Sequence, residues 1–244
     1  MNSKNALLTF WSRRPFFWAG LAGLLALLAA VLMANALREV SFETPPPFRD
    51  AVMAIEWAPS AETMDVVLGA APERARRIEA LLQATARDGL FVLAYTLFMC
   101  AFAVTAAWLS HRWRYLLLAA LALAVGLADL AENGAIRALL LLYDSETFEP
   151  GGADYVRVRL FAWAKWAGIT LYFIGIAPFL WSRGWVLGRL LALLAAAVAV
   201  MWVLAQFLRA WAELYSLAVF LLFAIAIGYC FVPVRASAAP PASS

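Results

Sequence analysis

Residues 126–137, GLADLAENGAIR, place four polar side chains inside a long apolar run: Asp129, Glu132, Asn133 and Arg137. At about 100° per residue, these side chains fall on one face of a helix. A charge in the hydrocarbon core of a membrane costs a few kcal/mol even on lenient scales. The stretch therefore needs partners or a hydrated cavity on neighbouring helices, and it is the first candidate for a functional site.

The composition is that of a membrane protein. Hydrophobic residues make up 65% of the 244 residues and charged residues 14%, against about half and about a quarter in soluble domains. The apolar residues come in runs of about 20, the length that crosses a bilayer as a helix. We therefore expect an all-α, polytopic transmembrane helical bundle in a lipid bilayer.

The apolar runs predict six spans. They lie at residues 16–37, 90–109, 115–143, 160–180, 190–208 and 212–232. The first run could instead be a signal peptide, because Arg13 and Arg14 precede it and residues 34–36 (ANA) resemble a cleavage site. Its 22 uncharged residues exceed the length of a signal h-region, which favours an uncleaved helix.

The remaining residues form connections and ends. Residues 38–88 are the only long polar segment, and we expect a small helical cap there with one strand considered at 52–58. Residues 144–159 form an acidic loop. Residues 1–15 form a basic N-terminus, and the Ala/Pro/Ser-rich tail at 233–244 is expected to be disordered.

Local signals divide the cap into helices. Ser60 is a suitable N-cap, and Gly69 is a plausible residue for ending the helix that follows. Pro72 favours the start of another helix, Glu73 onward, which can run directly into the second span.

The distribution of charge predicts the orientation. Four connections on one side contain eight Lys and Arg side chains and no acid; these are residues 1–15, 110–114, 181–189 and 233–244. The positive-inside rule then places both termini in the cytoplasm. The cap and the acidic loop lie on the other side, and the expected location is the inner (plasma) membrane of a bacterium.

Polar residues on neighbouring spans complete a candidate site. Lys165 lies on the fourth span at about the depth of Glu132, so we expect it to pair with Glu132 or Asp129. On the second span Asp88 and Tyr95 share one face, with Asp88 at the outer mouth. The candidate ligand-binding residues are Asp88, Tyr95, Asp129, Glu132, Asn133, Arg137, Lys165 and Tyr172.

Three functions remain open for this site. The first is ligand binding or transport, in which a pocket open to the extracytoplasmic side receives a small polar or amphipathic ligand such as a lipid headgroup. The second is a structural or assembly subunit that meets a membrane-protein partner, and whose charges only lock helix packing. The third is an intramembrane carboxylate enzyme, which the cations Lys165 and Arg137 oppose.

Familiar catalytic and metal-binding motifs are absent from the sequence. It has no HExxH, GxSxG or P-loop pattern, a single histidine (His111) and two cysteines, Cys100 and Cys230. We therefore propose no catalytic residue, metal ligand, cofactor or nucleic-acid partner. The two cysteines lie at different depths along their helices, so no disulfide is expected.

The sequence resembles a group of uncharacterised bacterial polytopic membrane proteins. The shared elements are a D-x-x-x-x-x-x-Y pattern that starts at Asp88, a D-x-x-E-N pattern that starts at Asp129, and Lys165 in the next span. The resemblance covers about residues 50–175 and leaves out the last two spans. It implies a four-helix core with a polar centre and implies no reaction.

Overall fold

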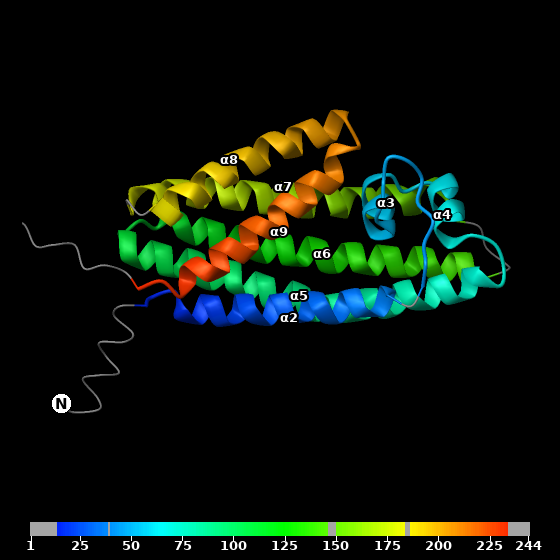
Figure 1. Ribbon diagram of the computed structural model, residues 1–244, viewed down its shortest axis with the longest axis horizontal. Helices are drawn as coiled ribbons and strands as arrows, with labels where there is room; N and C mark the ends of the chain where they lie inside the picture. Colours follow the sequence, from blue (N-terminus) through cyan, green and yellow to red (C-terminus); the bar gives the residue numbers. More distant parts are fainter. Residues whose placement is uncertain (1–13, 39, 146–149, 184–185, 234–244) are drawn as a thin grey trace, which may run out of the picture.

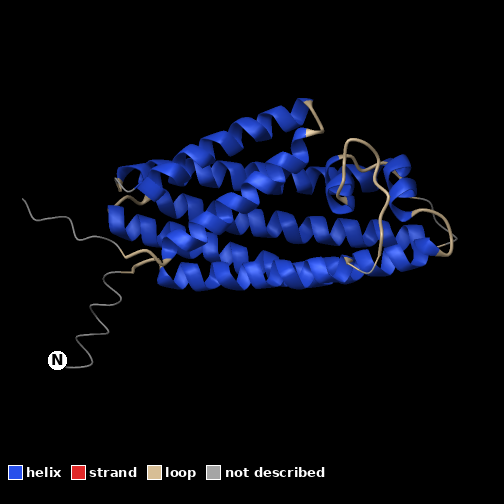
Figure 2. Cartoon of the chain, viewed as in Figure 1, coloured by secondary structure: helices blue, strands red, loops and turns tan. Residues whose placement is uncertain are grey.

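The structure, a computed structural model, describes residues 14–38, 40–145, 150–183 and 186–233 (Figure 1). The elements in these residues are all helical, as Figure 2 shows. Six helices are long and apolar enough to cross a membrane: α2 (Phe17–Leu37), α5 (Glu73–Ser110), α6 (Arg114–Asp144), α7 (Gly152–Ser182), α8 (Val186–Phe207) and α9 (Trp211–Cys230). The predicted all-α bundle with six spans is therefore confirmed, and the chain is a multi-pass membrane protein.

The six long helices form a closed ring. Each packs against the next in chain order, and α9 packs back against α2. In Figure 1, α9 crosses the bundle diagonally to reach α2, while α5, α6 and α7 run side by side. The blue end of α2 and the red end of α9 lie together, at the opposite end from the short helices α3 (Ala51–Trp57) and α4 (Ala61–Leu68).

Close approach between α5, α6 and α7 depends on glycine. A methyl group at Gly126 of α6 would clash with the Thr96 side chain of α5, and one at Gly168 of α7 would clash with Val125 of α6. Small residues allow helix backbones to approach closely in membranes, where packing replaces the hydrophobic effect between helices. These contacts bring the polar face of α6 against both neighbours.

The cap consists of α3 and α4, and the strand considered at 52–58 is wrong. The Asp50 carboxylate accepts a hydrogen bond from Met53 N at 2.9 Å and starts α3 as a helix. A short apolar run is compatible with a buried strand and with a buried helix. The N-cap hydrogen bond of Asp50 therefore decides that this run is helical. Ser60 accepts from Thr63 N at 3.1 Å and starts α4, which ends at Gly69 with φ of 65°, as predicted.

A second apolar core holds the cap on the bundle. Met64, Val67 and Leu68 of α4 are fully buried, together with Leu139 and Leu140 of α6. The predicted helix after Pro72 is present, and it continues without a break through the second span as α5. The cap therefore packs directly on the membrane bundle.

Several predicted boundaries shift by a few residues. α7 begins at Gly152, eight residues before the predicted span, because the Asp154 carboxylate accepts from Gly151 N at 3.0 Å and caps the helix. Both cysteines are free, in agreement with the sequence. The N-terminal residues 1–13 and the tail at 234–244 lie outside the described residues, and so do residues 146–149 of the acidic loop.

Candidate functional site

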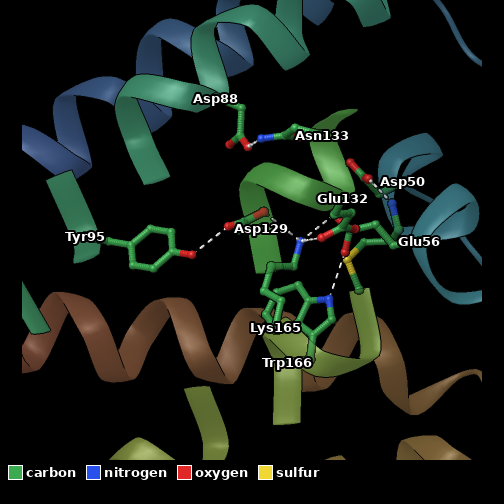
Figure 3. Close-up of polar contacts among 10 residues, drawn as sticks. Asp50, Glu56, Asp88, Tyr95, Asp129, Glu132, Asn133, Lys165 and Trp166 are labelled. Carbon is green, nitrogen blue, oxygen red and sulfur yellow. Dashed lines mark hydrogen bonds and ion pairs between the residues drawn. The ribbon is translucent and has the colours of Figure 1, made fainter. Parts of the chain in front are cut away.

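The centre of the site is the ammonium group of Lys165 on α7 (Figure 3). It contacts three carboxylates, at 2.6 Å (Glu132 Oε2), 3.0 Å (Glu56 Oε1) and 3.4 Å (Asp129 Oδ1). The exposed fraction is 6% for Lys165 and only 1% for Glu132. The predicted pairing of Lys165 with Glu132 and Asp129 is confirmed, and the contacts are direct and sealed from solvent.

Two hydrogen bonds extend this network to α5. Tyr95 donates its hydroxyl to Asp129 Oδ2 at 2.7 Å, and Asn133 donates its amide to Asp88 Oδ2 at 2.5 Å. Asp88 and Asn133 are only partly buried, at the cap end of the network. The structure therefore brings α5, α6 and α7 together at one polar centre, as the sequence predicted.

Glu56 on α3 is the residue that the sequence interpretation missed. Its Oε1 binds Lys165, and its Oε2 accepts from Trp166 Nε1 at 2.8 Å. The signal was a single acid in the apolar run VMAIEWA, residues 52–58, since a lone carboxylate in such a run requires a partner. Glu213 of α9 fixes the other end of α3, because its carboxylate accepts from Asp50 N at 2.9 Å.

Arg137 and Tyr172 do not join the network. Arg137 is exposed, because at 100° per residue it points about 110° away from the mean direction of Asp129 and Glu132. Tyr172 is buried on the same face of α7 as Lys165, but about 10 Å further along the axis at 1.5 Å per residue. Its hydroxyl donates to the carbonyl of Met99 at 2.7 Å and joins α7 to α5 within the apolar core.

The network contains more carboxylates than cations. Three carboxylates surround one ammonium, and Glu132 Oε1 is buried without a hydrogen-bond partner among the described residues. Uncompensated buried charge is costly, so the network favours another positive group nearby. Within the described residues, no cluster of His, Cys, Asp and Glu has the arrangement of a metal site.

A cleft lies beside the network, between α3, α7 and α8. Its accessible volume is about 50 Å³, and Glu56 lines it together with Arg159 and Arg209. Four indole side chains also line it: Trp57, Trp163, Trp166 and Trp202. Glu56 is buried whereas both arginines are exposed, so the cleft runs from the polar network to the surface.

The geometry weighs against paired-carboxylate chemistry at this centre. Such chemistry needs two carboxylates that share a proton without a compensating cation, and the Lys165 ammonium lies within 3.4 Å of all three. Comparison of the chain with protein-family models, curated proteins and solved structures gives no match. What the site defines is therefore a class: a helical multi-pass membrane protein with a buried ion-pair network and an adjacent cleft.

Proposed function

We propose that this protein binds an amphipathic ligand, such as a membrane lipid, at the extracytoplasmic end of its bundle in the bacterial inner membrane. The observation that carries the proposal is the position of Glu56. This carboxylate lines the cleft and at the same time binds Lys165 of the buried network. A ligand in the cleft would therefore contact the network through Glu56.

The ligand would occupy the cleft and not the buried network to which the sequence pointed. Asp129 and Glu132 are almost fully buried behind Lys165, which leaves no room for a ligand between them. Their role in this proposal is to hold Lys165 and Glu56, and with them helix α3, in position. The absence of acids from the basic connections supports cytoplasmic termini and an extracytoplasmic cleft.

A structural or assembly role is the second candidate. The direct contacts of Lys165, at 2.6 to 3.4 Å, favour it, because buried ion pairs can fix the register of packed helices. In that case the network would fasten the cap to the bundle, and the cleft would be a packing gap near a partner.

Native mass spectrometry of the purified protein separates the two candidates. Wild type is expected to retain a lipid, and Trp202→Leu to lose it, because Trp202 lines the cleft. Trp108→Leu is the matched control, since Trp108 is 69% exposed on α5, away from the cleft. Equal lipid retention by all three proteins would leave the structural role as the better explanation.

A further inference from the structure

We propose that the cleft recognises a zwitterionic phospholipid headgroup, which carries both a phosphate and an ammonium group. This inference rests on the lipid-binding function proposed above and names the class of headgroup. It follows from the distribution of charge along the cleft, which is positive at the mouth and negative at the inner end.

The mouth of the cleft suits a phosphate. Arg159 on α7 and Arg209 in the α8–α9 connection line it and are exposed. Neither forms an ion pair with an acid in the part of the chain that the structure describes. Guanidinium groups are suitable partners for phosphate oxygens.

The inner end of the cleft suits an ammonium group. Glu56 accepts one hydrogen bond at each oxygen, and a carboxylate has room for about four. Behind it, one lysine is shared by three carboxylates, so a second positive group would reduce the excess of negative charge. Indole rings also attract cations, and the Lys165 ammonium already lies 5.0 Å from the centre of the Trp166 ring.

Apolar side chains next to the cleft indicate a lipid in place of a free phosphoamine. Leu160 and Trp163 on α7 are 58% and 49% exposed, and Phe207 and Leu208 at the end of α8 are 80% and 54% exposed. In a membrane protein such residues face acyl chains. A lipid could therefore place its headgroup in the cleft while its chains remain in the bilayer.

Other headgroups match only part of this arrangement. A purely anionic headgroup would supply the phosphate but no positive group for Glu56, whose lysine partner is already shared. A neutral diacylglycerol would leave the two arginines at the mouth without an acceptor. Only a headgroup with both charges matches the mouth and the inner end together.

The test titrates the purified full chain in detergent with lipids of identical acyl chains and measures binding by native mass spectrometry. Phosphatidylethanolamine is expected to bind about tenfold more tightly than phosphatidylglycerol, N-acetylated phosphatidylethanolamine or diacylglycerol, a difference of about 1.4 kcal/mol. The N-acetylated lipid keeps the phosphate and lacks only the ammonium charge. Equal binding of phosphatidylethanolamine and its N-acetylated form would overturn the ammonium site, and equal binding of diacylglycerol would overturn headgroup recognition as a whole.

Variants locate the phosphate site. Arg159→Gln and Arg209→Gln are each expected to weaken phosphatidylethanolamine binding about tenfold and to leave diacylglycerol binding unchanged. Arg157→Gln is the matched control, because Arg157 is exposed on the same helix and pairs with Asp154 at 3.7 Å. An equal loss in Arg157→Gln would contradict the assignment.

Three further outcomes separate the possible failures. If water-soluble phosphoethanolamine competes as well as the lipid at equal concentration, the ligand is a free phosphoamine and the lipid part of the inference is wrong. If none of the four lipids binds, the proposed lipid-binding function itself fails. If all four bind equally well, that function stands and only the headgroup class is wrong.

Discussion

The Lys165 ammonium lies 3.0 Å from Glu56 Oε1, across 109 positions of sequence, and 2.6 Å from Glu132. One buried cation on α7 therefore holds both the cap helix α3 and the transmembrane helix α6. This arrangement makes the cap and the bundle one unit.

Lys165→Met is expected to destabilise the protein by about 3–5 kcal/mol, the usual cost of removing one partner from a buried ion pair. Three carboxylates would then share a buried site with no cation. Unfolding in detergent, followed by circular dichroism, measures the loss. The double variant Lys165→Met/Glu132→Gln should recover part of the stability, because one of the buried negative charges is removed. A single variant as stable as wild type would show that the network contributes nothing to stability.

Glu56→Gln is expected to loosen α3. A neutral amide keeps the shape of the side chain but loses the charge that faces Lys165 and Trp166, at a cost of about 1–3 kcal/mol. Hydrogen exchange of residues 51–57 should become faster, whereas α5 should be unaffected. Glu62→Gln on the exposed side of α4 is the control and should leave exchange at its wild-type rate.

Tyr95→Phe should cost more stability than Tyr172→Phe. Both tyrosines are buried and donate one hydrogen bond at 2.7 Å, Tyr95 to the Asp129 carboxylate and Tyr172 to a backbone carbonyl. Hydrogen bonds to charged groups contribute about 1.5–3 kcal/mol and neutral ones about 0.5–1.5 kcal/mol. Denaturation curves of the two variants give the comparison directly, and equal losses would contradict the prediction.

Gly126→Ala is expected to destabilise the bundle by about 1–3 kcal/mol, as overpacking usually does. The added methyl group would clash with Thr96. Thr96→Ala should rescue it, since the atoms that clash most closely are removed. Gly134→Ala is the matched control on the same helix: it has open space around it and should be neutral or stabilising by up to about 1 kcal/mol.

The orientation can be tested with single cysteines in a chain from which Cys100 and Cys230 have been replaced. Glu62→Cys on the cap and Arg112→Cys in the turn between α5 and α6 are both at exposed positions. In intact cells a membrane-impermeant maleimide should label the cap cysteine alone, and permeabilisation should allow labelling of the other. The reverse pattern would place the termini outside the cytoplasm.

The amino-acid sequence by itself determined the six spans and most of the polar centre. Span number follows from the length of apolar runs, a local property of the chain. The pair formed by Lys165 and Glu132 was predictable because their helices are consecutive and the two residues lie at similar depth. A buried charge needs a partner, and these were the nearest available.

Only the tertiary structure decided the remaining parts. Glu56 belongs to a short apolar run whose helical conformation depends on Asp50 as its N-cap. The partner of Glu56 is Lys165, on a helix that is distant in the sequence. The exclusion of Arg137, in contrast, did not need the tertiary structure, because at about 100° per residue it points away from Asp129 and Glu132. The cleft joins α3, α7 and α8, whose relative positions depend on long-range contacts. The local sequence determines which residues share a face of a helix. Which helix faces contact each other is determined by the packing of all six long helices.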